Sequence, residues 1–398
     1  MKIGLVSPFL PHDLADLLDA RSRGDLLHIQ GVAAPSVSPM VREWHRRGHE
    51  ISIFSLDQSL SSPHHLQGER LSIHMLPKRR NRECLLDCYR AECRLIRAAV
   101  ERESPVVLHA QWTYEHALAA LKCNLPTAVT CHDSPLRCAW IQKHWHMTYH
   151  LFIAWKVIRN ADRLICVSPY TAQHIQKYFK PRCPVNIIPN GLMPNVFLRG
   201  QRRLSIGLRK ENPFTICSVG CWGGLKNITT LLKAFAIAHN MHRSTKLVLF
   251  GRGLGPGEAG EQWAIRRQLH RGVVFKGNTQ RNVILDFLET EADLMAHPSL
   301  NEAHGMVLIE AMACGVPVIG GSQSGAVPWT LDEGRCGFLC DVRDEMLLAQ
   351  TILKAINQSG ENRVLAERSW LSVQNRFSIA SSASANENVL RELVAANS

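Results

Sequence analysis

The segment of residues 297–317, HPSLNEAHGMVLIEAMACGVP, places two carboxylates near the start of a short helix. Glu302 lies in a loop after a predicted strand, and Glu310 lies in a helix predicted over 306–313 whose other side chains are almost all apolar. Such a carboxylate is costly to bury unless a hydrogen-bonding group meets it. The unpaired N–H groups at the helix start form an anion site beside Glu302. A ligand that carries both hydroxyls and phosphates would satisfy both features.

The ends of this helix are marked by glycine and proline. We expect the helix to begin near Gly305 and to stop at Gly315, where a left-handed terminus belongs, with Pro317 just beyond it. The helix is therefore short, and its amino end stays close to Glu302.

The elements that position these residues follow an alternating pattern. Short apolar runs alternate with helical patterns along most of the chain, which is typical of βαβ units and parallel sheets. We predict strands at 3–6, 50–54, 106–109, 127–131, 164–167, 214–219, 246–250, 272–275, 294–296 and 316–319. Ligands of open α/β sheets bind outside the carboxyl ends of the strands, so the functional residues should lie in loops that follow strands.

A polar stretch divides the chain into two halves. Residues 198–203 lead through Arg209-Lys210-Glu211-Asn212 to Pro213, which has the character of a linker before a new first strand. We predict an N-terminal domain over 1–199 and a second domain over 200–376, both α/β with doubly wound parallel sheets. Two domains of nearly equal size would face each other across a cleft.

Composition excludes several classes of protein. The 398 residues are 45% hydrophobic, which argues against a disordered chain. We see no uncharged apolar stretch of 18 residues and no complete signal-peptide core, so we expect a protein that is neither secreted by that route nor membrane-spanning. The 13 cysteines are scattered, which fits a reducing cytoplasm. The alternating histidines of 144–150 would point to different faces of a helix, which disfavours a metal site.

The net charge of +12 implies attraction to something acidic. The sharpest basic run comprises Lys78, Arg79, Arg80 and Arg82. Two interpretations stay open: a solvated basic face, or a patch that faces an anionic membrane or a phosphate. Nucleic acid is disfavoured, because no zinc-finger spacing, RNA-binding aromatic signature or helix-turn-helix pattern accompanies the charge.

Several motifs, in order along the chain, resemble those of the retaining nucleotide-sugar glycosyltransferases of family 4, which have the two-domain GT-B fold. The two glutamates are separated by seven residues and are followed by AMACGVP. The other matching motifs are HIQGVA at 28–33, VREWHRRGHE at 41–50, TCHD at 130–133, VS at 167–168, IPNG at 188–191, SVG at 218–220 with Lys226, and DEGRCGFL at 332–339. The similarity covers almost the whole chain. The resemblance also implies that the segment 377–398, whose helical pattern runs from Phe377 to Leu393, forms a helix that crosses back to the N-terminal domain.

The resemblance implies a role for each matching residue. Glu302 and His132 would face the donor sugar, Lys226 would neutralise the diphosphate, and Glu310 would bind the ribose hydroxyls. The remaining donor-binding residues implied are Gly31, Gly220, Arg252, His304, Gly305, Met306 and Val307. It implies neither a cofactor nor a metal ion, because the nucleotide sugar is itself the substrate. Retention is usually explained in this family by front-face attack, in which the leaving phosphate takes the acceptor proton.

The chain also departs from the family pattern. Cys221 stands where the family commonly has a second phosphate-binding cation, an arginine, and Arg252 is a candidate to replace that charge. His304 stands in a position where it could contact the sugar or a phosphate. The leading hypothesis is a cytoplasmic transferase that extends a glycan or lipid-linked acceptor, as in the synthesis of surface polysaccharides. The alternatives are a sugar-nucleotide-binding module that has lost catalysis, or an epimerase or phosphorylase of the same fold.

The basic run bears on the acceptor. In this family the N-terminal half binds the acceptor, and Lys78, Arg79, Arg80 and Arg82 all lie in that half. If the acceptor is carried on an anionic lipid, these residues should lie on its approach side, each contributing on the order of 1 kcal/mol near the surface. We therefore expect reversible docking on the inner face of the cell membrane.

Overall fold

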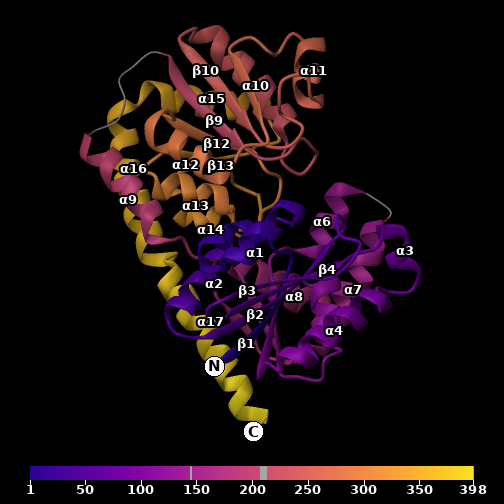
Figure 1. The fold of residues 1–398 in the computed structure, drawn as a ribbon. Coiled ribbons are helices and arrows are strands. Elements are labelled where there is room, and N and C mark those ends of the chain that lie inside the picture. Colours follow the sequence, from indigo (N-terminus) through magenta and orange to yellow (C-terminus); the bar gives the residue numbers. More distant parts are fainter. Residues whose placement is uncertain (144–145, 207–212, 398) are drawn as a thin grey trace. The chain divides into compact units, whose positions relative to one another are not determined.

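The computed structural model describes residues 1–143, 146–206 and 213–397 (Figure 1). Contacts divide the chain into two compact units. Unit 1 comprises residues 1–191 and 379–398, and unit 2 comprises residues 192–378. None of the helices in the described ranges is both long and apolar enough to cross a membrane.

Unit 1 contains an eight-stranded sheet in the order β3-β4-β2-β1-β5-β6-β7-β8. All neighbours are parallel except the edge strand β3, which pairs antiparallel with β4. The strands are β1 (Lys2–Val6), β2 (Glu50–Asp57), β3 (His64–Gly68), β4 (Leu71–Pro77), β5 (Val107–Gln111), β6 (Thr127–Cys131), β7 (Arg163–Cys166) and β8 (Val185–Ile187). The sequence predicted five of these strands and missed β3, β4 and β8.

The helices of unit 1 cover this sheet. Alanine-rich α5 and the apolar stripe of α7 pack with α4 in one continuous core. The described α-helices are α1 (Ala20–Asp25), α2 (Val37–Arg46), α3 (Asn81–Leu86), α4 (Arg90–Glu103), α5 (Glu115–Ala120), α6 (Pro135–Gln142), α7 (His146–Asn160), α8 (Pro169–Phe179) and α17 (Ile379–Asn397); the 3₁₀ helices are η1 (Pro11–Leu17) and η2 (Leu26–His28). Of the histidine run at 144–150, residues 144 and 145 lie outside the described residues.

Unit 2 contains an all-parallel six-stranded sheet in the order β11-β10-β9-β12-β13-β14. The strands are β9 (Phe214–Val219), β10 (Thr245–Phe250), β11 (Val273–Gly277), β12 (Leu294–His297), β13 (Val318–Gly321) and β14 (Phe338–Cys340). Because apolar side chains of both faces are covered, the strands are almost continuously apolar, as parallel sheets require.

Helices lie on both faces of that sheet. One core cluster contains side chains of α10 and α15, and a second contains those of α9, α12, α13 and α16. The helices are α9 (Pro194–Ile206), α10 (Ile228–Met241), α11 (Ala259–Arg266), α12 (Arg281–Thr290), α13 (Met306–Ala313), α14 (Val327–Thr330), α15 (Glu345–Asn357) and α16 (Ser359–Arg376), with 3₁₀ helix η3 (Asp332–Gly334). Both units therefore have the predicted doubly wound architecture.

The boundary between the units lies at residues 191 and 192, earlier in the sequence than the predicted boundary at residue 199. Residues 194–206 form one helix, α9, which packs on α12, α13 and α16 of unit 2. Of the polar side chains that suggested a linker, Gln201 and Arg202 are exposed, whereas Arg203 is buried. Arg199 and Arg202 pair with Glu289 of α12. The rest of the predicted linker, residues 207–212, lies outside the described residues.

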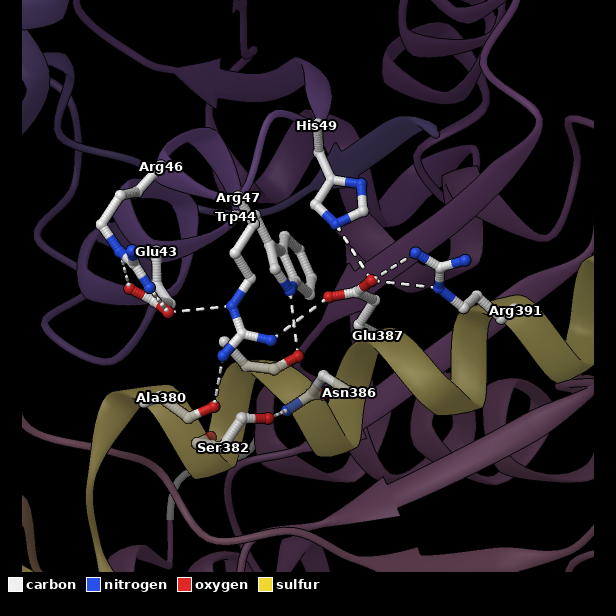
Figure 2. Close-up of polar contacts among 11 residues, drawn as sticks. Glu43, Trp44, Arg46, Arg47, His49, Ala380, Ser382, Asn386, Glu387 and Arg391 are labelled. Atoms are coloured by element: carbon white, nitrogen blue, oxygen red, sulfur yellow. Dashed lines mark hydrogen bonds and ion pairs between the residues drawn. The ribbon is translucent and has the colours of Figure 1, made fainter.

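The C-terminal helix α17 belongs to unit 1 and packs on α2 (Figure 2). Trp44 Nε1 donates a hydrogen bond to the Ala383 carbonyl at 3.1 Å, although 339 residues separate them. The carboxylate of Glu387 meets Arg47 at 3.4 Å and His49 at 3.3 Å. The HRRGHE part of the sequence thus holds the last helix of the chain.

This contact predicts a stability effect. Glu387→Ala should lower the free energy of unfolding by about 1 to 3 kcal/mol, because it leaves His49 without its carboxylate partner and removes one of the two carboxylates that Arg47 contacts, the other being Glu43. Glu392→Ala on the same helix is the matched control, since Glu392 is largely exposed and reaches only Arg163, at 3.4 Å. Denaturant unfolding measures both variants, and equal losses would contradict the prediction.

Candidate functional site

Gly305 starts the helix that carries the candidate site. It has a φ of 84°, a conformation that favours glycine, and it is the N-cap residue of α13. Leu308 N–H bonds back to the Gly305 carbonyl at 3.0 Å, so the N–H groups of Met306 and Val307 precede the first intrahelical bond. The predicted positive end of α13 is therefore formed by these three residues.

Glu302 is held beside this helix by two nitrogen donors. Its Oε1 accepts from Lys226 Nζ at 2.5 Å and from His297 Nε2 at 2.8 Å. Since a carboxylate oxygen can only accept, His297 Nε2 carries a proton. Glu302 is mostly buried, with 14% of its side chain exposed, and His297 is almost fully buried.

These contacts decide the charge of Glu302. Burial alone would raise its pKa, but the charge of Lys226 and the hydrogen bond from His297 outweigh burial and hold the pKa well below its usual range. Glu302 is therefore an anion at neutral pH. His297 belongs to no motif of its own. The only sign of its role in the sequence is its place at the end of a predicted strand, five residues before Glu302.

Backbone hydrogen bonds between three loops fix this arrangement. Leu300 N–H donates to the Leu225 carbonyl at 2.9 Å, which ties the loop of Lys226 to the loop of Glu302. Glu302 itself bonds through its backbone to residues 324 and 326. The three loops follow β9, β12 and β13, which are neighbours in the sheet, so their carboxyl ends meet at one edge.

Glu310 has a partner that the sequence analysis missed. Arg281 Nε, at the start of α12, donates to Glu310 Oε1 at 2.7 Å. The Glu310 side chain is 9% exposed, so the guanidinium supplies the hydrogen bond that a carboxylate in an apolar helix requires. Arg281 lies 29 residues before Glu310 in no recognisable motif.

His304 is packed within an aromatic cluster. Its ring is 2% exposed and meets the Phe377 ring edge-on at 4.8 Å, with the Trp329 ring at 5.8 Å. Arg376 lies over both partner rings and donates to the Trp329 carbonyl. The structure thus places His304 beside Gly305 but in packed surroundings.

The loops after β9 and β10 bring two further predicted residues together. Gly220 N–H bonds to the Phe250 carbonyl at 2.9 Å, and a side chain at Gly220 would crowd Lys226. Trp222 N–H donates to the Arg252 carbonyl at 2.8 Å, which sets exposed Arg252 next to the loop of exposed Cys221. The replacement of the missing arginine by Arg252 stays a prediction.

Within unit 1, His132 follows β6 and is bonded by a residue of β5. His132 Nε2 donates to Gln111 Oε1 at 2.6 Å, and the Trp112 ring lies 4.4 Å from the imidazole. Burial lowers the pKa of His132 to about 3, so the ring is neutral at physiological pH. Gln111 also contacts His109, which is fully buried against Thr130. The sequence analysis did not single out Gln111.

Gly31 requires its lack of a side chain. It has a φ of 65°, and a Cβ there would lie 2.7 Å from the Phe9 carbonyl oxygen. Its N–H donates to Asp57 Oδ2 at 2.7 Å, so a buried carboxylate at the end of β2 holds this loop.

The basic run of unit 1 is largely paired. Lys78 Nζ donates to Glu115 Oε1 at 2.7 Å, and Arg79 binds both Glu92 and Asp87. Buried and half-buried carboxylates therefore neutralise Lys78 and Arg79, and the expected docking of this run on a membrane stays a prediction. Arg80 and Arg82 are exposed.

Comparison with known proteins matches both units. The model of Glycosyltransferase Family 4 matches residues 36–195, and that of Glycosyl transferases group 1 matches residues 203–369. The chain belongs to glycosyltransferase family 4. The segment that contains Lys226, Glu302 and Glu310 lies within the second match, and the segment with His132 lies within the first.

The similar proteins act in different reactions. The D-inositol 3-phosphate glycosyltransferase of Corynebacterium jeikeium is 28% identical over 213 residues, 50% of this chain and 50% of that protein. The chain spans about half the length of the first curated relatives it matches. The sucrose-phosphate synthase of Thermosynechococcus elongatus superposes with a TM-score of 0.81 at 19% identity over 100% of both chains. Anabaena HepE in complex with UDP-glucose gives 0.69 at 17% identity, over 98% of this chain and 100% of that one. These structures show the GT-B fold.

The ionised state of Glu302 predicts a pH dependence. Its folded pKa lies below the ordinary 4.5, so its ion pair stabilises fully above that pH and is lost as pH falls toward the folded pKa. The difference in unfolding free energy between wild type and Glu302→Gln should therefore be largest at neutral pH and shrink below about pH 4.5. Denaturant unfolding across this range measures it, and a difference independent of pH would contradict the assignment.

Proposed function

We propose that this glycosyltransferase moves a sugar from a nucleoside diphosphate sugar to a glycan or lipid-linked acceptor with retention of anomeric configuration. The observation that carries the proposal is the Lys226–Glu302–His297 cluster beside the amino end of α13. A buried anion, a cation and a row of free N–H groups lie together there. These groups match a ligand that bears hydroxyls at one end and phosphates at the other.

The two carboxylates would take different parts of the donor. Lys226 and His297 both bind Glu302 Oε1, which leaves Oε2 to accept from a sugar hydroxyl. Arg281 binds Glu310 Oε1, which leaves its Oε2 for a ribose hydroxyl. Because each carboxylate is already oriented by a cation, little side-chain entropy remains to be lost on binding.

The phosphates would lie between the helix start and Lys226. The N–H groups of Met306 and Val307 and the partial positive charge of α13 favour an anion. Lys226 adds a full charge that neutralises the leaving diphosphate as the bond to the anomeric carbon breaks. The acceptor oxygen bonds to that carbon on the same face, and its proton passes to the departing phosphate oxygen.

The acceptor is proposed at the level of class. The curated relatives are named for small acceptors, D-inositol 3-phosphate and L-malate, so a glycan or lipid-linked acceptor of surface polysaccharide synthesis rests on the resemblance of the motifs alone. A peripheral membrane location would have to rest on Arg80 and Arg82, because Lys78 and Arg79 are paired internally.

Donor binding and turnover test the proposal together. Calorimetry with UDP-, GDP-, ADP- and CDP-sugars should find one that binds, and that donor should raise the melting temperature by mass action. NMR of the product made with that donor and a suitable acceptor should show the donor's anomeric configuration. An inverted product would contradict retention. Formation of an epimerised sugar in the absence of acceptor would show that the protein is an epimerase and not a transferase. Binding without turnover against all acceptors would favour a lapsed module, for which Cys221 in place of arginine is the relevant feature.

The two carboxylates should respond differently to mutation. Glu310→Ala should weaken donor binding by about tenfold, since it removes one charged hydrogen bond. Glu302→Ala should lower turnover by about 10²-fold or more with a smaller effect on binding, because it faces the reacting sugar. Steady-state kinetics and calorimetry separate these effects. Full activity in either variant would remove that residue from the site.

A further inference from the structure

A second cluster of ligand-type side chains lies in unit 1, among residues that the proposed function does not use. Within the described residues, His65, His74 and Glu103 bring two imidazoles and a carboxylate within 4.8 Å of one another. The rings of the two histidines stack at 4.4 Å. Glu103 Oε1 lies 3.0 Å from His74 Nε2 and 4.0 Å from His65 Nε2.

The sheet dictates this convergence. His65 of β3 and His74 of β4 are direct partners in the antiparallel edge pair, so both side chains leave the same face of the sheet. Glu103 is the last residue of α4 and reaches the same face. Three elements of the chain therefore deliver one donor atom each.

Two contacts to the other carboxylate oxygen of Glu103 orient Oε1 toward the histidines. That oxygen, Oε2, accepts from Ser52 Oγ at 3.1 Å and lies 3.4 Å from Lys2 Nζ. Such outer contacts turn Oε1 toward the imidazoles, as they do in metal centres where ligands are held by further hydrogen bonds.

We infer that His65, His74 and Glu103 form a binding site for a zinc-like divalent cation. Two nitrogens and one carboxylate oxygen suit Zn²⁺, whereas Mg²⁺ and Ca²⁺ prefer oxygen ligands alone. Tetrahedral zinc needs donor atoms about 3.3 Å apart. The separations from Oε1 bracket that value, and binding would require the half-exposed His65 ring, which stacks on His74, to turn the remaining distance. Water would complete the coordination.

The charges around the cluster permit a cation. Lys2 is shared between Glu103 and Glu50, which lies 2.9 Å away, so two carboxylates face one ammonium group. Arg102 also acts on His74. A bound ion would link the edge strands β3 and β4 to the end of α4.

Cobalt titration tests the site directly. Metal-free protein is titrated with Co²⁺ as a spectroscopic substitute for zinc and then with competing Zn²⁺. One equivalent should give visible d–d bands without sulfur-to-metal charge transfer, which distinguishes this site from the 13 cysteines. His65→Ala and Glu103→Gln should each weaken Zn²⁺ binding by at least about tenfold, and lower pH should do so as protons compete for the imidazoles.

His64→Ala is the matched control. His64 is adjacent on β3, and its side chain leaves the opposite face of the strand, so it should bind Zn²⁺ like wild type. Zn²⁺ should also raise the melting temperature of wild type and His64→Ala but not of His65→Ala. Thermal unfolding without metal checks that all variants fold. Absence of a thiolate-free cobalt spectrum, or Zn²⁺ affinity unchanged in both His65→Ala and Glu103→Gln, would overturn the inference and leave His74 and Glu103 as a simple hydrogen-bonded pair.

Discussion

Burial of the Glu302 carboxylate is the constraint on which the candidate site depends. A buried anion must be paired and hydrogen-bonded, and here Lys226 and His297 do both. Their convergence depends on strand order. Lys226 follows β9, His297 ends β12, and the residues that bind the Glu302 backbone follow β13. Because these three strands are neighbours and parallel, the carboxyl end of the sheet collects groups from distant parts of the sequence.

Some of this arrangement was predictable from the sequence, and the reason is local. The helix of α13 is bounded by glycines with positive φ at 305 and 315, and one polar residue stands out within its apolar pattern. The presence of a carboxylate, Glu310, within an apolar helix could therefore be recognised before any partner was known. The partner itself could not. Arg281 begins another helix and has no motif around it, so only the packing of α12 near α13 reveals it.

The edge strand β3 and the pairing within the basic run were hidden from the sequence for different reasons. Strand β3 has the sequence His64-His65-Leu66-Gln67-Gly68, in which a single apolar residue is buried, so it carries no apolar run. Edge strands need little burial and therefore leave a weak pattern. The pairing of the basic run was hidden because counting charges cannot show that Glu92, 13 residues beyond Arg79, folds back to bind it.

The motifs that identify the family do not all carry chemistry. The HRRGHE run is among the longest matches, yet its Arg47 and His49 contact Glu387 of α17 within unit 1. In this chain, that part of the resemblance lies in residues that hold the last helix in place. The carboxylates of 302 and 310 differ, because they lie beside and within α13, whose unpaired amino-terminal N–H groups form an anion site. Evidence for activity therefore resides mainly in the segment around α13, and the other motifs are evidence for the fold that positions it.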